Sequence, residues 1–318
     1  MIFPVQSHRG ARVGAQPLRC APFVLFARLT RLTRLGRLGR LGLVVILAAG
    51  CVPVAVRLGA ANLVENGDAS QMEIAYGPGV RQRYDVYRPV DAKGLPLAGP
   101  RPVVIFIHGG SWESGSKEAY AWVGQSLALQ GYVAVLPNYG LMPTTHFPGF
   151  VEDAARAVAD AHARMAEWGG DPTRFYLMGH SAGAQIAALL AYDTHYLGAH
   201  GMAAGSVAGF IGLSGPYDFV YDTPLLQRTF GGTPAEERAA QPIAFVDRQS
   251  IRTLLVMGRQ DRTVDPRNTR SLADRLMGFG VSVDTLWVDG EHGVSVGAFA
   301  RPYRSKSVIV PRVRAFIE

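Results

Sequence analysis

The feature that most constrains the fold of this chain is a regular alternation of short apolar runs with longer helix-like segments. The apolar runs lie at 102–107, 132–136, 174–178, 207–213, 253–257 and 282–288. The helix-like segments between them lie at 118–130, 150–168, 182–193 and 268–279. Apolar strands that alternate with helices are typical of a parallel sheet with both faces covered. The sequence therefore predicts an α/β protein with a mostly parallel central sheet and helices on both faces.

Two parts of the chain depart from this alternation. Residues 71–76 and 81–87 flank a Gly-Pro-Gly turn, so we predict that they form an antiparallel pair. Residues 216–250 interrupt the pattern with aromatic residues set among turn residues. We interpret this stretch as an insertion over the edge of the sheet, in the position of a lid, rather than as a second domain. One folded domain is therefore expected over residues 71–318.

The first 50 residues have a composition of their own. They hold eight of the chain's 32 basic residues and none of its 25 acidic residues, and they end in an apolar run at 41–49. A basic segment followed by a short apolar one is the pattern of a secretory signal. The uncharged stretch at 41–56 is shorter than the roughly 20 residues that a membrane-spanning helix needs. We therefore predict that residues 1–50 are a signal peptide rather than a transmembrane anchor.

The apolar run closes with Leu-Ala-Ala-Gly before Cys51, which resembles the cleavage box of bacterial lipoproteins. In such a box the cysteine is lipidated and becomes the new N-terminus. The resemblance implies a lipid anchor to the membrane at Cys51, a tether over residues 51–70 and export to the cell envelope. Val52 after the cysteine favours the outer membrane, with the protein facing the periplasm. The alternative is an ordinary signal-peptidase site beside an incidental cysteine.

Charge and cysteine content exclude several classes of function. Outside the leader the chain holds 24 basic and 25 acidic residues, so no basic stripe remains that would bind nucleic acid. Two cysteines in the whole chain are too few to build a disulfide framework, and structural zinc usually needs more Cys and His ligands at close spacing. We expect no metal, no organic cofactor and no nucleic-acid partner, and a fold held together by its apolar core.

The strongest chemical signal is the segment at 179–183, Gly-His-Ser-Ala-Gly, between a predicted strand and a predicted helix. In a Gly-x-Ser-x-Gly elbow the serine sits on a sharp turn that exposes its hydroxyl, and the glycines avoid collisions with the neighbouring elements. We therefore expect Ser181 to be a nucleophile. The alternative is an ordinary loop in which Ser181 caps the following helix.

A serine nucleophile needs an imidazole as base and a carboxylate to orient that imidazole. Asp261 follows the fifth apolar run, and His292 lies in a Gly-flanked loop after the last one. The order Ser181, Asp261, His292 is the one expected of an α/β-hydrolase. Asp265 is the rival of Asp261, but it lies farther from the strand end. We interpret His180, beside the nucleophile, as a packing residue.

Attack by a serine on a carbonyl group creates an oxyanion, which backbone amides can stabilise. The segment His-Gly-Gly-Ser-Trp at 108–112 follows the first apolar run, and its consecutive glycines let the backbone come close to a substrate. We expect the amides of Gly109, Gly110 and Ala182 to form the oxyanion hole. His108 is expected to hold this loop by hydrogen bonding.

From about residue 84 to 292 the chain resembles the serine esterases of the α/β-hydrolase superfamily, in particular the carboxylesterase group related to hormone-sensitive lipase. The matching pieces are Asp-Val-Tyr-Arg-Pro at 85–89, the glycine loop at 108–110, Asn-Tyr-Gly-Leu-Met-Pro at 138–143, the elbow at 179–183, and Asp261 with His292. His180 and the Gly-Gly-Ser-Trp loop are similar to kynurenine formamidase, feruloyl-esterase-like and prenylcysteine methylesterase-like members. Gly140 departs from the group, which usually has Arg there.

The resemblance implies the α/β-hydrolase fold with a small lid insertion, and a serine esterase that cleaves carboxylic esters of small substrates through an acyl-enzyme. We expect Trp112, Tyr139 and Tyr217 to line the substrate pocket, because ligand pockets are mostly apolar. An aryl-formamidase or amide hydrolase with the same triad is the nearest alternative. A catalytically inactive hydrolase-fold lipoprotein that binds a surface partner is the alternative from another class. The sequence sets no expectation for the oligomeric state.

Overall fold

The structure, a computed structural model, describes residues 61–62 and 69–318, which all belong to one compact unit. The predicted signal peptide (1–50), Cys51 and most of the predicted tether lie outside the described residues. Within the described part of the chain, no helix has both the length and the apolar character needed to cross a membrane.

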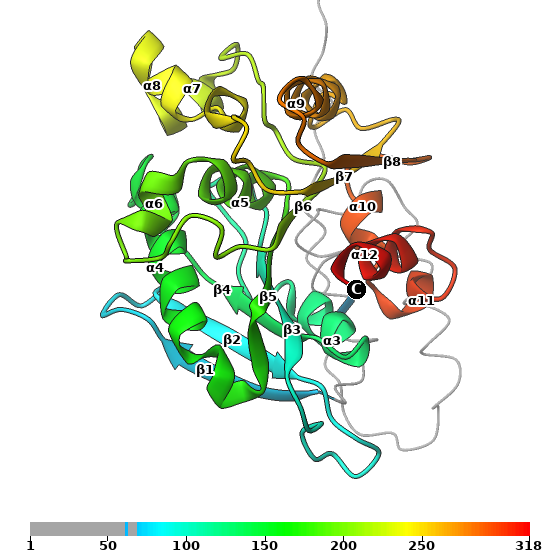
Figure 1. The fold of residues 1–318 in the computed structure, drawn as a ribbon. Coiled ribbons are helices and arrows are strands. Elements are labelled where there is room, and N and C mark those ends of the chain that lie inside the picture. The colour runs from blue at the N-terminus through cyan, green and yellow to red at the C-terminus, as the bar shows by residue number, and fades with distance from the viewer. Residues whose placement is uncertain (1–60, 63–68) are drawn as a thin grey trace, which may run out of the picture. The chain divides into compact units, whose positions relative to one another are not determined.

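An eight-stranded sheet forms the centre of this unit (Figure 1). Its strands in chain order are β1 (Ser70–Ala75), β2 (Arg83–Arg88), β3 (Arg101–Ile107), β4 (Val133–Pro137), β5 (Gly170–His180), β6 (Gly209–Leu213), β7 (Thr253–Gly258) and β8 (Val283–Val288). In space they follow the order β1-β2-β4-β3-β5-β6-β7-β8. Only β2 runs antiparallel to its neighbours, β1 and β4, and all other pairs are parallel. The predicted mostly parallel sheet is confirmed, and so is the antiparallel pair at its start.

Helices cover both faces of the sheet. The predicted helical segments appear as α3 (Ala121–Leu129), α4 (Gly149–Arg164) with its continuation η1 (Met165–Trp168), α5 (Ala182–Tyr192) and α9 (Arg267–Gly278). Further short helices were not predicted: α6 (Thr194–Gly198), α7 (Pro224–Phe230), α8 (Pro234–Ala239), η2 (Pro242–Phe245), α10 (Val294–Gly297), α11 (Arg301–Arg304) and α12 (Ile309–Ile317). Figure 1 shows α4 and α5 on one side of the sheet and α3, α10 and α12 on the other.

The core is divided by the sheet into two apolar layers. Successive side chains of a strand point to opposite faces, and β3 illustrates this. Val103, Ile105 and Ile107 belong to the layer under α4 and α5, whereas Val104 and Phe106 belong to the layer under α3 and α12. All five side chains are fully buried. Each such side chain contributes about 1.5–3 kcal/mol relative to its exposed state, which explains why these runs are apolar without interruption.

The insertion between β6 and β7 contains three short helices, α7, α8 and η2. Thr223 and Thr233 cap α7 and α8 through their side chains, and a proline follows each of them at the first helical position. Both features favour a helix start. Within the insertion, η2 contacts α5 and α9. The insertion therefore lies beside α5, the helix that follows β5.

The strand register brings the ends of the central strands together. In the parallel pairs, Ile107 of β3 lies opposite Gly179 of β5, His180 lies opposite Leu213 of β6, and Gly258 of β7 lies opposite Val288 of β8. The loops that follow these residues all leave the sheet at its carboxyl edge, which is where open α/β sheets bind ligands. The predicted functional segments therefore share one edge of the sheet.

Candidate active site

The elbow between β5 and α5 holds Ser181 in a strained backbone conformation. Its φ is +55° and its ψ is −126°, a combination that non-glycine residues rarely adopt. A Cβ atom on Gly183 would lie 2.1 Å from the carbonyl oxygen of Ile107 and 2.3 Å from that of His108. Only glycine allows α5 to start this close to the end of β3. The spacing of glycines around Ser181 therefore has a steric cause in this fold.

The structure brings the three predicted triad residues together. The Nε2 atom of His292 lies 2.8 Å from Oγ of Ser181, and its Nδ1 atom lies 2.8 Å from Oδ2 of Asp261. Ser181 and Asp261 are both buried, and the His292 side chain is only slightly exposed. The loops after β5, β7 and β8 thus supply a continuous hydrogen-bonded series from hydroxyl to imidazole to carboxylate.

Backbone amides fix the orientation and charge of the Asp261 carboxylate. Its Oδ1 atom accepts hydrogen bonds of 2.9 Å from the amides of Thr263 and Val264, which leaves Oδ2 directed at His292. Burial alone would raise the pKa of Asp261, but the hydrogen bond and charge of His292, together with these two amides, lower it below its ordinary value. Because an ionised carboxylate can only accept a hydrogen bond, the proton of neutral His292 must lie on Nδ1. The Nε2 atom is then free to accept a proton.

Asp265, the rival carboxylate, has a different role in the structure. It is exposed, and its Oδ1 atom accepts a 2.8 Å hydrogen bond from the backbone amide of Arg267, the first residue of α9. It makes no contact with His292. The structure therefore assigns Asp265 to the start of a helix and Asp261 to the imidazole.

His180 packs directly against His292, a contact that the sequence did not indicate. The two ring centroids are 4.9 Å apart, and the Nδ1 atom of His180 lies 3.1 Å from the hydroxyl of Tyr120. Burial, followed by the charge of His292, lowers the pKa of His180 to about 3. The residue is therefore neutral at physiological pH and packs beside the imidazole of His292, in agreement with the packing role expected for it.

The loop after β3 lies against the nucleophile. A Cβ atom on Gly109 would be 3.0 Å from Cβ of Ser181, and Gly110 has φ +135°, a value that favours glycine. Ala182 is the first residue of α5, where an amide has no acceptor within the helix. Ser111 lines the same cleft as Ser181 and Ala182, and its amide donates to no acceptor in the described part of the chain. Ser111 is thus a further candidate donor, which could have been suspected from its place directly after the two glycines.

An open cleft of about 710 Å³ lies beside Ser181. One wall is apolar and comes mostly from the insertion; it includes Trp112, Pro216, Phe219, Val220, Leu225 and Leu226. Another part of the lining comes from residues 261–268, which include two arginines and two aspartates. We call this cavity the Ser181 cleft. Trp112 lines it, as predicted from the sequence.

The other two predicted pocket residues, Tyr139 and Tyr217, do not line the Ser181 cleft. Tyr139 is fully buried behind the loop after β3; its hydroxyl donates to the carbonyl oxygen of His108 and its ring stacks on the His108 imidazole at 4.3 Å. Tyr217 is fully buried in the core, where its ring lies edge-on to Phe210. Both predictions were wrong because the aromatic content of a segment does not reveal which way each ring points.

The structure also bears on metal binding. Among the residues that it describes, no group of three or more His, Cys, Asp or Glu side chains is arranged to hold a metal ion.

A serine on a strand–helix elbow, with a carboxylate and an imidazole supplied after later strands of a mostly parallel sheet, defines an α/β-hydrolase. Solved structures with this fold include an esterase B of Lactobacillus rhamnosis, with a TM-score of 0.70 and 20% identity, covering 86% of this chain and 96% of that one. Another is EstE1, a carboxylesterase from a metagenomic library, with a TM-score of 0.68 and 20% identity, covering 83% and 95%. The predicted α/β-hydrolase fold is confirmed.

Within that class the chain belongs to the BD-FAE family, whose model matches residues 84–276. It is 30% identical over 240 residues to a protein of Oryza sativa named "Probable isoprenylcysteine alpha-carbonyl methylesterase", covering 69% of this chain and 55% of the relative. It is 32% identical over 222 residues to Esterase LipC of Mycobacterium tuberculosis, covering 64% and 54%. The chain therefore spans about half the length of the curated relatives that it matches. The predicted resemblance to esterases of this superfamily is confirmed.

Proposed function

We propose that this protein is a serine hydrolase that cleaves carboxylic esters of small substrates through an acyl-enzyme intermediate. The observation that carries the proposal is the hydrogen-bonded series of Ser181, His292 and Asp261, together with the open cleft that Ser181 and Asp261 line. Relatives named as esterases support the same reaction type. The triad and oxyanion roles given below belong to this proposal.

In the first half of the reaction, Oγ of Ser181 attacks the carbonyl carbon of the ester while Nε2 of His292 takes the hydroxyl proton. The imidazolium that forms keeps its Nδ1–H bonded to Asp261, whose negative charge stabilises it. The carbonyl oxygen becomes an oxyanion beside the amide of Ala182 and the loop that carries Gly109, Gly110 and Ser111. Donors of this kind are each worth about 3 kcal/mol of transition-state stabilisation.

Acylation is completed when Nε2–H of His292 protonates the leaving alkoxide. The bond between the carbonyl carbon and that oxygen breaks, and the acyl group remains on Ser181. A water molecule then gives a proton to Nε2 and attacks the acyl carbon. Collapse of the second tetrahedral intermediate releases the acid and returns the proton to Ser181. The apolar wall of the Ser181 cleft favours an apolar acyl or alcohol group.

The decisive experiment compares the wild-type protein with Ser181→Ala on p-nitrophenyl esters of increasing chain length and on N-formylkynurenine. We expect the wild type to hydrolyse the esters and Ser181→Ala to lose at least about 10³-fold in kcat. A fluorophosphonate should modify Ser181 and no other serine, as read by mass spectrometry. Faster turnover of N-formylkynurenine than of any ester would favour an amide hydrolase, and equal rates for both proteins would favour an inactive binding protein.

We also propose that the protein is exported and anchored to a membrane through a lipid on Cys51. Support comes from the basic leader, the short apolar run and the small residues before the cysteine. The mass spectrometry above tests this when the full chain is expressed in a bacterial host, because the N-terminal peptide of the purified protein is read in the same run. An acylated Cys51 is expected at the N-terminus, and any other N-terminus contradicts the anchor.

A further inference from the structure

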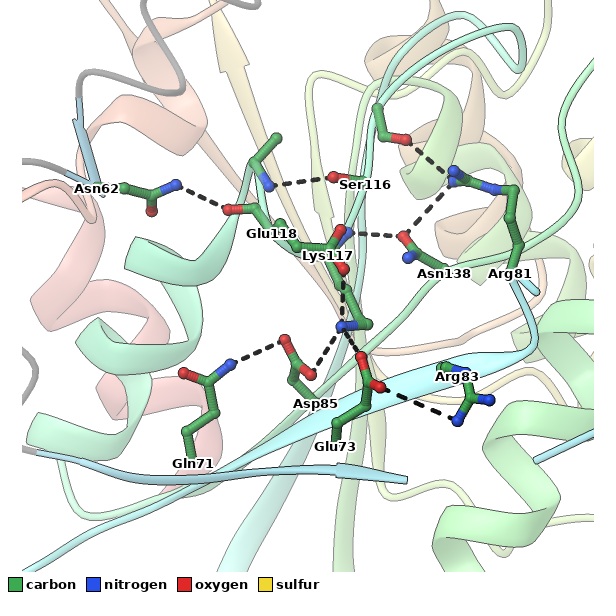
Figure 2. Close-up of polar contacts among 12 residues, drawn as sticks. Asn62, Gln71, Glu73, Arg81, Arg83, Asp85, Ser116, Lys117, Glu118 and Asn138 are labelled. Carbon is green, nitrogen blue, oxygen red and sulfur yellow. Dashed lines mark hydrogen bonds and ion pairs between the residues drawn. The ribbon is translucent and has the colours of Figure 1, made fainter. Parts of the chain in front are cut away.

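The turn between β1 and β2 reaches the loop that follows β3 through one side chain, Arg81. Its Nε atom donates to the carbonyl oxygen of Tyr139 at 2.7 Å, and a terminal nitrogen donates to that of Gly115 at 3.0 Å. The same nitrogen lies 3.5 Å from Oδ1 of Asn138. Figure 2 shows the guanidinium group of Arg81 directed at Asn138. One rigid cation thus joins two segments that are far apart from it in the sequence.

Gly115 connects this contact to the start of the loop after β3. A Cβ atom on Gly115 would lie 2.2 Å from the carbonyl oxygen of Gly109 and 2.7 Å from Nδ1 of His108, so its backbone packs directly on both residues. Gly109 in turn lies against Ser181. A displacement of the Gly115 carbonyl would therefore shift the backbone beside the nucleophile.

The second acceptor, Tyr139, leads to the same place. The Tyr139 hydroxyl donates to the carbonyl oxygen of His108 at 2.9 Å, and its ring stacks on the His108 imidazole. Burial lowers the pKa of His108 to about 4, so this imidazole is neutral, and its Nδ1 atom lies 2.9 Å from the carbonyl oxygen of Gly109. Both carbonyl oxygens that Arg81 binds therefore belong to residues in contact with His108.

A cluster of charges around the buried ammonium of Lys117 holds the far end of the loop. The ammonium of Lys117, almost fully buried, lies 2.7 Å from Glu73, 2.9 Å from Asp85 and 2.8 Å from Glu118. Its backbone amide donates to Asn138 at 2.7 Å. Figure 2 shows carboxylates from β1 and β2 converging on this one ammonium. A buried ion cluster is weak evidence for stability but can fix the position of the segments it joins.

We propose that Arg81 is a positioning residue for the oxyanion hole: with Asn138 and Lys117, it holds the loop at 108–118 so that its amides point at the oxyanion formed on Ser181. The proposal rests on the function proposed above. Arg81 lies behind the loop, touches no part of the Ser181 cleft, and acts only through the residues it binds.

The test compares Arg81→Gln with Arg83→Gln, its matched control on the same hairpin. Among the described residues the Arg83 side chain pairs with Glu73 alone, at 3.9 Å, and it does not reach the loop. We expect Arg81→Gln to lower kcat about 10–100-fold with KM changed less than about threefold, since small misplacements of oxyanion donors cost this much. Arg83→Gln should retain wild-type kinetics. Arg81→Lys should recover only part of the rate. Its ammonium keeps the positive charge, but it lacks the planar group that binds two carbonyl oxygens at once.

Three further measurements separate positioning from general damage. Rates are expressed per site titrated with fluorophosphonate, so partial unfolding of Arg81→Gln does not lower them. A trifluoromethyl ketone reacts with the Ser181 hydroxyl to form a tetrahedral adduct that carries an oxyanion. Its affinity for Arg81→Gln should therefore fall in parallel with kcat/KM. The acid limb of the pH profile of kcat/KM should not move.

Four outcomes are decisive. Unchanged kcat per titrated site in Arg81→Gln overturns the proposal. A loss without weaker binding of the trifluoromethyl ketone, or with a shifted acid limb, also overturns it. Wild-type protein that shows no Ser181-dependent hydrolysis overturns the proposed function as well, whereas an active wild type with an unaffected Arg81→Gln overturns the positioning role alone.

Discussion

Two aspartates, Asp261 and Asp265, follow strand β7, and the structure separates them by their hydrogen bonds. Asp261 holds the imidazole of His292 with one oxygen and accepts backbone amides with the other. Asp265 accepts the amide of Arg267 at the start of α9. Asp261 is also the nearer of the two to the end of β7. This distance can be read from the sequence and already favoured Asp261.

Replacing each aspartate by asparagine tests this assignment. An amide at 261 can present its NH₂ to His292 and stabilise the wrong tautomer, so we expect Asp261→Asn to lower kcat about 10³–10⁴-fold. Asp265→Asn, the control, should stay within about threefold of the wild type. The measurement is kcat for a p-nitrophenyl ester per fluorophosphonate-titrated site. Similar losses in both variants would contradict the assignment.

Single residues differ in how well the sequence predicts them. Ser181 is predictable because its elbow needs glycines at fixed positions, and the chain order of the triad then points to His292. The buried rings of Tyr139 and Tyr217 are not predictable as core residues, because both follow predicted strands at positions where a ring can turn either way. The contact between His180 and His292 depends on loops from distant strands and has no local signal.

At the level of elements, a buried amide side chain joins the insertion to the loop after β3. Gln185 of α5 accepts a 3.1 Å hydrogen bond from the indole nitrogen of Trp112 and donates a 2.8 Å bond to the carbonyl oxygen of Ala240. The Trp112 ring also lies edge-on to Phe230 of α7, at 4.8 Å. The loop after β3, the helix after the elbow and the insertion are therefore one packed assembly.

The contribution of this amide can be measured with Gln185→Met, a change that keeps the length of the side chain. It leaves the Trp112 N–H and the Ala240 carbonyl buried without partners, and each such group costs about 1–3 kcal/mol. We expect the free energy of unfolding in urea to fall by at least about 2 kcal/mol. Gln249→Met, at an exposed position, is the control and should have little effect. Equal stability of the two variants would show that the bridge contributes nothing.

The sequence predicts the long elements better than the short ones. Strands such as β3 and β7 are recognisable because both of their faces are buried, which keeps their sequences apolar throughout. Helices of one or two turns, such as α7, α8 and α10, are too short for an amphipathic period to appear. The Thr-Pro pairs that begin α7 and α8 were available as start signals.

At the level of the whole molecule, two buried histidines make the fold sensitive to acid. Burial lowers the pKa of His108 to about 4 and that of His180 to about 3, from an ordinary value of 6.5. The unfolded chain therefore binds protons at a higher pH than the folded protein does. Stability from these neutral imidazoles is complete above pH 6.5 and is lost as the pH falls toward 4.

This loss can be followed by urea unfolding between pH 7.5 and pH 4.5. For His108 alone, the difference in pKa corresponds to a loss on the order of 3 kcal/mol over the whole transition. We expect the pH dependence to be shallower in His108→Asn than in the wild type, whatever the stability of that variant at pH 7.5. His200→Asn, which changes an exposed histidine, should keep the wild-type slope. An unchanged slope in His108→Asn would exclude this residue as a cause.

The fold as a whole could be predicted as a class but not in its arrangement. The alternation of strands and helices indicates a parallel sheet, yet it does not say that β2 lies beside β4 or that η2 packs on α5. Those placements depend on which apolar faces fit together. The charge cluster around Lys117 is hidden for the same reason, since Glu73, Asp85 and Glu118 look like ordinary solvated residues in the sequence.

The hairpin of β1 and β2 has a practical consequence for attaching this protein to a support. Among the described strands β1 is an edge strand that pairs in the sheet with β2 alone, and the turn between them carries Arg81. A force applied through the N-terminal end would separate β1 from β2 first. By the role proposed for Arg81, that force would lower activity before it disrupted the core. Attachment through the C-terminal end loads α12 instead, whose Ile317 carbonyl is held by the hydroxyl of Tyr176 in the central strand β5.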